Sequence, residues 1–387
     1  MGDHPGRYPE GEFRRRVAAL QARMAAADIA ALLLTTAADV FYVTGFLTRF
    51  WESPARPWFV VVPAAGDPVA VIPSIGAELM AGTWLSDIRC WDAPHPEDDG
   101  VSLLADTLND MVPPSGRIGL PMGLETHLRM PLADYLRISD RLAPREMADA
   151  TDILHRVREI KSEAEIELIR ATCRIADAAF ARVPEFAGPG VPLDAVFRDF
   201  QCALLGEGAD WVSYVAGGAG PGGYGDVISP ATARPLARGD VLMLDTGAVK
   251  DGYFCDFDRN YAVGPPSDAV RRVHDALYAA TDVALAALRP GMTAADLHRL
   301  MTATLKSAGV EAGGGRLGHG LGIALTEWPS LTPLDDTELR ENMVLTLEPG
   351  AVVSPGRILV HEENIVLRAD GPELLSARAP AELPVLG

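Results

Sequence analysis

Asp245 and Asp256 stand inside an apolar run that otherwise reads as the core of a β-hairpin. The run covers residues 242–264 and has the sequence LMLDTGAVKDGYFCDFDRNYAVG. Burying a carboxylate costs free energy unless the group is paired with a cation or coordinates a metal ion. A chain that contains this hairpin therefore has to fold so that a positive group meets both aspartates.

Three segments further along the chain carry an acid or an imidazole in similarly apolar surroundings. They are RLGHGLGIALTEWPS with His319, VLTLEPG with Glu348, and LVHEENIVL with Glu362. Hard oxygen ligands and one imidazole, without a thiolate, suit divalent manganese, cobalt, iron or zinc. Four carboxylates around two divalent ions nearly balance the charge. Each residue alone also fits an ordinary turn, loop or surface position, so the prediction of a metal site depends on the whole set.

Composition narrows the class of protein. The 387 residues are 48% hydrophobic and carry a formal net charge of −19. This length predicts two domains, and the acidity argues against nucleic acid and anionic membranes as partners.

The four cysteines contain no CxxC pair, so neither a disulfide framework nor a thiolate zinc site is expected. The sequence shows no signal-peptide core and no apolar run of membrane-spanning length, and we expect a cytoplasmic enzyme.

The strand and helix pattern predicts a domain boundary at residue 157. Residues 1–157 alternate helical and strand-like segments, which is typical of a small α/β domain. Residues 158–387 combine long helices with separate strand-rich segments, which indicates an α+β domain. The predicted segments are a helix at 11–28, a hairpin at 58–73, a helix that begins at the capping box of Ser162 and Glu165, helices near 268–288 and 294–308, and a glycine-rich loop at 217–225.

With these segments in place, the chain resembles the pita-bread metallohydrolases: methionine aminopeptidase, aminopeptidase P, prolidase and their relative creatinase. The resemblance covers about residues 155–378 and extends more loosely to the N-terminal domain. The matching motifs are Asp245-Thr246-Gly247 with Asp256 eleven residues later, His319-Gly320-Leu321-Gly322, Glu348-Pro349-Gly350, Glu362-Glu363-Asn364-Ile365, and the helix start EIKSEAEI at Glu159–Ile166. Fold class is therefore expected to be α+β, with a C-terminal pita-bread domain behind a creatinase-like α/β domain.

The resemblance implies a chemistry and a set of roles. Asp245, Asp256, His319, Glu348 and Glu362 would hold two divalent metal ions, with manganese expected first and cobalt, iron or zinc as alternatives. Glu348 would also transfer a proton, so that an activated water hydrolyses a C–N bond. The resemblance further implies a homodimer acting on a short peptide or another small molecule.

One more residue, Arg259, looks like a family hallmark because it follows the second aspartate by three positions. The resemblance implies that its guanidinium orients a ligand carboxylate from behind the metals. A surface salt bridge is the ordinary alternative for this arginine.

The sequence departs from the peptidases of this family at two positions. They carry a second histidine seven residues after the metal-binding histidine, where this chain has Thr326, and another upstream of the first aspartate, where it has GYGDVISP with Tyr224 and Asp226. Thr326 can still form a hydrogen bond to a substrate, and Tyr224 and Asp226 are candidates for a polar contact from the opposite side. We therefore keep two substrate classes open. One is a proline peptide of the Xaa-Pro dipeptidase or aminopeptidase P type. The other is a small amide or amidine, as for ectoine hydrolase or creatinase. A dimethylsulfoniopropionate lyase and a non-catalytic binding protein rank lower.

The segment TGFLTRFWESPARPWF at 44–59 is the other informative part of the N-terminal domain. In two-domain relatives this domain reaches over the partner subunit's site. Arg49 and Arg56 are therefore candidates for binding a substrate carboxylate, because a guanidinium can hold that group at two points. The ordinary alternative is a loop with packed aromatic side chains.

Overall fold

A computed structural model describes residues 8–53 and 56–387 of the chain. They divide into two compact units, Met1–Arg158 and Glu159–Gly387. Each unit has its own sheet system and its own buried apolar cluster. None of the helices in the described ranges is long and apolar enough to span a membrane.

The first unit is built on one six-stranded sheet with the order β4-β3-β2-β1-β5-β6. β1 runs antiparallel to β2 and parallel to β5, so the sheet is mixed. Its elements are α1 (Glu10–Ala26), β1 (Ala31–Leu34), α2 (Ala37–Thr44), β2 (Phe59–Pro63), β3 (Val69–Pro73), η1 (Ser74–Gly76), α3 (Ala77–Ala81), β4 (Ile88–Trp91), α4 (Val101–Met111), β5 (Arg117–Leu120), α5 (Leu132–Leu142), β6 (Glu146–Asp149) and α6 (Thr151–Arg158).

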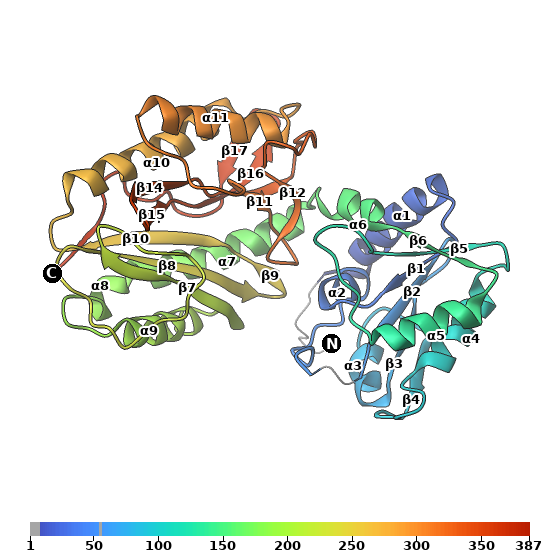
Figure 1. Cartoon of the computed structure of the whole chain (residues 1–387). Helices are drawn as coiled ribbons and strands as arrows, with labels where there is room; N and C mark the ends of the chain where they lie inside the picture. Colours follow the sequence, from blue (N-terminus) through green and yellow to red (C-terminus); the bar gives the residue numbers. More distant parts are fainter. Residues whose placement is uncertain (1–7, 54–55) are drawn as a thin grey trace. The chain divides into compact units, whose positions relative to one another are not determined.

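Helices cover the sheet of the first unit. Every residue of β1, β2 and β3 is buried, as expected for strands enclosed on both faces. Leu33, Phe59 and Val71 pack with Leu104 of α4 and Ile138 of α5, and Figure 1 shows the helices around the sheet. The predicted α/β organisation is confirmed.

The second unit contains several sheets instead of one. One has the order β18-β10-β8-β7, with β9 paired to β8; another has the order β12-β11-β13-β16-β17; β14 and β15 form a separate pair. The elements are α7 (Glu163–Ala181), α8 (Val183–Phe186), α9 (Leu193–Gly206), β7 (Trp211–Pro221), β8 (Asp240–Lys250), β9 (Tyr253–Phe254), β10 (Phe257–Val263), α10 (Asp268–Ala287), α11 (Ala294–Ser307), β11 (His319–Gly320), β12 (Glu327–Ser330), β13 (Val344–Leu347), β14 (Gly350–Ser354), β15 (Arg357–Val360), β16 (Glu363–Arg368), β17 (Gly371–Leu374) and β18 (Val385–Leu386).

The sheets of the second unit lie between two groups of helices. Figure 1 shows α10 and α11 on one side and α7, α8 and α9 on the other. α10 contacts β14 and β17, whereas α7 contacts β8 and α9 contacts β7. The helix α7 begins at the predicted capping box, in which Ser162 and Glu165 bond each other's main-chain N–H groups. The predicted α+β class is therefore confirmed for this unit.

The hairpin of β8 and β10 has the expected core position, and its register places Asp245 opposite Asp258. One prediction is wrong at this sheet: most of the glycine-rich stretch 217–225 is strand rather than loop, because β7 continues to Pro221 and pairs with β8. Gly217 has a φ of +129°, and a Cβ there would lie 2.2 Å from the main-chain oxygen of Met243. The glycine allows a close strand approach that periodicity does not reveal.

Candidate metal centre

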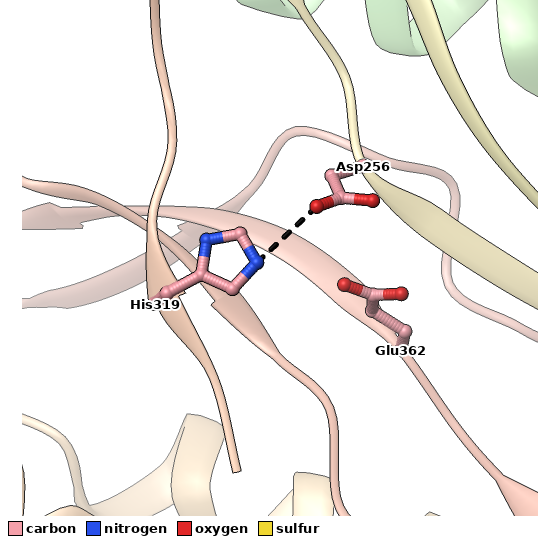
Figure 2. Close-up of side chains that lie close together, drawn as sticks. All are labelled: Asp256, His319 and Glu362. Atoms are coloured by element: carbon pink, nitrogen blue, oxygen red, sulfur yellow. Dashed lines mark ion pairs between the residues drawn. The ribbon is translucent and has the colours of Figure 1, made fainter. Parts of the chain in front are cut away.

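Three of the predicted ligands form one buried cluster. Asp256, His319 and Glu362 offer ligand atoms that all lie within 4.8 Å of one another. Figure 2 shows their side chains pointing toward one another from three separate segments. His319 Nε2 lies 3.2 Å from Asp256 Oδ2. An imidazole and two carboxylates that converge in this way provide the donor set of a divalent metal site.

Main-chain and side-chain contacts fix the direction of these groups. The amide of Asn364 accepts from the Asp256 N–H at 3.0 Å and donates back to the Asp256 carbonyl. The His319 N–H donates to Thr346 Oγ1 at 3.0 Å. His319 Nδ1 lies 2.7 Å from the Gly320 carbonyl oxygen, and only a protonated Nδ1 can donate to it. In the neutral ring this leaves the Nε2 lone pair facing the two acids, as a metal ligand requires.

The two remaining predicted ligands border this cluster. Glu348 follows β13 directly, and its Oε2 lies 3.9 Å from His319 Nε2. Asp245, in β8, accepts a hydrogen bond of 3.1 Å from the hydroxyl of Tyr214, which also bonds Asp256. All five residues therefore belong to one group of contacts, with Asp256 at its centre.

Asp245, Glu348 and Glu362 resist ionisation in the metal-free protein. Burial raises the pKa of Asp245 and of Glu362 well above the usual values, and the negative charge of Asp256 adds to both shifts. Burial also raises the pKa of Glu348, against the opposing effect of His319. For His319 itself, burial lowers the pKa, but the hydrogen bond to Asp256 and the charge of Glu348 outweigh it, so the net shift is upward.

A bound cation would remove this repulsion. Glu362 Oε1 is buried and has no hydrogen-bond partner in the described part of the chain. An orphaned carboxylate oxygen costs free energy, and a metal ion would satisfy it. The residues present therefore fit a divalent metal.

Arg316 lies at the more exposed edge of the site. Arg316 Nε donates to Glu348 Oε1 at 3.3 Å, and its terminal nitrogen donates to Thr326 Oγ1 at 3.4 Å. The side chains of Arg316 and Glu348 are 34% and 20% exposed, unlike the buried floor formed by Asp256 and His319. A guanidinium therefore contacts Thr326, the position at which the peptidases carry their second histidine.

The other predicted substrate residues of the second unit are engaged within the chain. Tyr224 is buried; its hydroxyl donates to Asn260 Oδ1 at 3.1 Å and accepts from the Val360 N–H. Asp226 is exposed and accepts from the Ile228 and Ser229 main-chain N–H groups in a turn. Neither side chain has a contact with the five predicted ligands among these hydrogen bonds.

Arg49 and Arg56 belong to the first unit. Arg49 is exposed and lies 3.9 Å from Glu52, whereas the guanidinium of Arg56 lies over the ring of Phe50 at 5.4 Å. Their proposed contact with a substrate carboxylate stays a prediction.

Arg259 reaches a ligand residue through the main chain. It donates to the carbonyl oxygen of Glu362 at 2.8 Å, and its other terminal nitrogen lies 3.1 Å from the Glu363 carboxylate. Burial alone would raise the pKa of Glu363, but Arg259 and His361 hold it at about 2. The ionised Glu363 thus fixes Arg259 beside the segment that carries Glu362.

Sequence reasoning missed three polar groups at this site. Tyr214 joins Asp245 to Asp256 across paired strands, and no local spacing reveals it. Arg316 meets Glu348 only because the segments before β11 and after β13 run side by side, as the bond from the Glu348 N–H to the Leu317 oxygen shows. Asp258 differs from these two groups, because it lies within the predicted hairpin and its pairing with β8 places it opposite Asp245.

Comparison with known proteins matches both units. Residues 167–369 match the model of metallopeptidase family M24, and residues 16–160 match the creatinase/prolidase N-terminal domain. The "Probable dipeptidase PepE" of Mycobacterium tuberculosis is 30% identical over 98% of both chains. The Xaa-Pro dipeptidase of Pyrococcus horikoshii is 28% identical over 66% of this chain and 73% of its own.

Solved structures show the same architecture. The crystal structure of dipeptidase PepE from Mycobacterium ulcerans has a TM-score of 0.85 at 30% identity, covering 98% of this chain and 100% of that one. A prolidase from Thermococcus sibiricus has a TM-score of 0.86 at 24% identity, over 97% and 99% of the two chains, which supports the fold. The chain therefore belongs to metallopeptidase family M24, as a metal-dependent hydrolase with a creatinase/prolidase N-terminal domain.

Proposed function

We propose that residues 158–387 form a two-metal hydrolase that cleaves a C–N bond, and that residues 1–157 assist in substrate binding. The ligands would be Asp245, Asp256, His319, Glu348 and Glu362. The observation that carries this proposal is the buried convergence of Asp256, His319 and Glu362 within 4.8 Å. Because the donors are oxygen-rich with one imidazole, manganese is the proposed metal, with cobalt, iron and zinc as alternatives.

Divalent ions held by these residues would supply an activated water and polarise the carbonyl of the substrate. Glu348 is the proposed proton carrier, because it is the most exposed of the predicted ligands that border His319 and its pKa is raised from the usual value. It would accept a proton from the attacking water and deliver it to the leaving nitrogen. Arg316 would hold Glu348 Oε1 in place during this transfer.

The first candidate substrate class is the Xaa-Pro dipeptides. Support comes from relatives that cover nearly the whole chain and are named as dipeptidases, and from a prolidase of the same fold. The free carboxylate of a dipeptide would suit the guanidinium of Arg316, since charge-assisted bonds between these groups are strong.

The second candidate class is a small amide or amidine, and a specific observation favours it. Thr326 stands where the peptidases carry their second histidine, and it contacts Arg316. The imidazole that binds the peptide carbonyl in the peptidases is therefore replaced by a hydroxyl and a guanidinium. A small substrate that carries its own carboxylate would depend less on that imidazole for binding.

A turnover screen of the manganese-loaded protein tests these proposals. It compares Ala-Pro and Gly-Pro with small amides and cyclic amidines. Glu348→Ala is expected to lower turnover by at least about a hundredfold, as loss of a proton carrier does, while Glu341→Ala, at an exposed acid, should match the wild type. Metal analysis should give two equivalents per chain. No bound metal, or full activity of Glu348→Ala, would contradict the proposed mechanism.

The homodimer and the cytoplasmic location also stay predictions. Light scattering on the purified full chain tests the first, and cell fractionation tests the second.

A further inference from the structure

A further carboxylate, Asp258, lies beside the proposed metal centre and has no role in the five-residue set. It is 2% exposed and stands in β10, directly opposite Asp245 in the register of β8. Residues opposite each other in an antiparallel pair point to the same face of the sheet. Asp256 precedes β10, and it lies close to Asp245 because the hydroxyl of Tyr214 bonds both carboxylates.

Neighbouring groups orient the Asp258 side chain through only one of its oxygens. Its Oδ1 accepts a hydrogen bond of 3.0 Å from Asn260 Nδ2. Asn260 is itself held, since it accepts from the Tyr224 hydroxyl and donates to the Val360 carbonyl oxygen at 2.7 Å. The bond to Val360 also places Asn260, and with it Asp258, next to the segment that leads into Glu362.

The second oxygen, Oδ2, is buried and makes no hydrogen bond within residues 8–53 and 56–387. Arg259, the next residue, donates to the main-chain oxygen of Asp258 and places its other terminal nitrogen against Glu363. A buried carboxylate oxygen without a hydrogen-bond partner carries a desolvation cost, which the charge of Arg259 offsets only in part.

A purely structural role for Asp258 does not account for this arrangement. Bonding to Asn260 requires one acceptor oxygen, which a threonine or an asparagine would provide without a buried charge. Within the described residues, Asp258 Oδ2 and Glu362 Oε1 are both buried carboxylate oxygens without a hydrogen-bond partner, and the charge of Asp258 acts on Glu362. Oxygens of this kind are what a hard divalent cation binds.

We propose that Asp258 is a sixth metal-binding side chain, which contributes its Oδ2 to the ion held on the Asp245 side of the centre. This inference rests on the proposed two-metal function. A fifth carboxylate makes the site richer in oxygen, so it favours manganese, which accepts a high number of oxygen ligands, over zinc.

Metal titration of the apo full chain by calorimetry tests this role without relying on turnover. Asp258→Asn is expected to weaken binding of one Mn²⁺ equivalent by about tenfold or more, while changing Zn²⁺ affinity less. The matched control Asp370→Asn removes an exposed aspartate from the turn between β16 and β17, and should bind both metals within twofold of the wild type. Thermal melting of the apo proteins checks folding, and Asp258→Thr is the second variant if the asparagine variant does not fold.

The visible absorption of Co²⁺-loaded protein separates ligation from a general charge effect. Loss of a ligand lowers the coordination number and changes the d–d bands, whereas loss of a nearby charge leaves them as they are. Unchanged Mn²⁺ affinity in Asp258→Asn would overturn the inference, as would an equal loss for Mn²⁺ and Zn²⁺ with an unchanged Co²⁺ spectrum. Wild-type protein that takes up none of Mn²⁺, Co²⁺ and Zn²⁺ would overturn the proposed function together with it, so the two failures are distinguishable.

Discussion

Lys161 and Glu327 form a buried ion pair in the second unit. Their Nζ and Oε2 atoms are 3.1 Å apart, and the side chains are 2% and 4% exposed. Glu327 Oε1 also accepts from the Ala324 N–H at 3.0 Å. The pair therefore fixes the turn between β11, which begins at His319, and β12, and it holds the neighbour of Thr326.

Removing only the cation should be costly. In Lys161→Met the Glu327 carboxylate stays buried without Lys161, and breaking a buried pair in this way costs about 3–5 kcal/mol. The double variant Lys161→Met/Glu327→Gln leaves no charge at these two buried positions and can keep the bond from the Ala324 N–H. Its cost should be close to that of one lost hydrogen bond, about 1 kcal/mol. We therefore expect the losses of unfolding free energy in Lys161→Met and Glu327→Gln, added together, to exceed the loss in the double variant by at least about 2 kcal/mol.

Urea unfolding of the apo protein measures these costs, with the wild type, both single variants and the double variant analysed as a cycle. Lys306→Met, at an exposed lysine of α11, is the control and should lie within about 0.5 kcal/mol of the wild type. A cost below about 1 kcal/mol for Lys161→Met, or single costs that simply add in the double variant, would refute the role of this pair.

Three further predictions concern the site and its support. Saturating Mn²⁺ should stabilise the protein by about 2.7 kcal/mol at a hundred times the Kd, and Asp256→Asn should remove this gain in a thermal melt. Glu363 and His361 have folded pKa values of about 2 and about 4, below their ordinary 4.5 and 6.5, so both favour folding above those ordinary values. The contribution of His361 should be lost as the pH falls below 6.5 and that of Glu363 below 4.5, so denaturation at a series of pH values from 7 to 3 should show the stability difference between wild type and Glu363→Gln shrinking below pH 4.5. Arg316→Met should raise KM about tenfold or more for substrates with a free carboxylate, and it should change KM little for the corresponding amides. An equal change of KM for both kinds of substrate would contradict an anion-binding role of Arg316.

The sequence determined the elements whose signals are local. Periodicity and end signals placed the long helices α7, α10 and α11, and the capping box of Ser162 lies where its spacing predicts. The hairpin of β8 and β10 was predictable because alternation has a short period. The strand β7 was missed, since its glycines read as a loop and only pairing with β8 makes them extended.

The ligand types and their order along the chain were also readable, because acids in apolar strands need compensation wherever they occur. What the chain order does not contain is the distance between segments that are far apart in sequence. The tertiary structure decided that Tyr214 bridges Asp245 and Asp256 and that Arg316 meets Glu348. It also decided that one oxygen of Asp258 has no hydrogen-bond partner in the part of the chain that the structure describes. These contacts depend on strand register and on how segments pack together, and such non-local properties leave no spacing in the sequence.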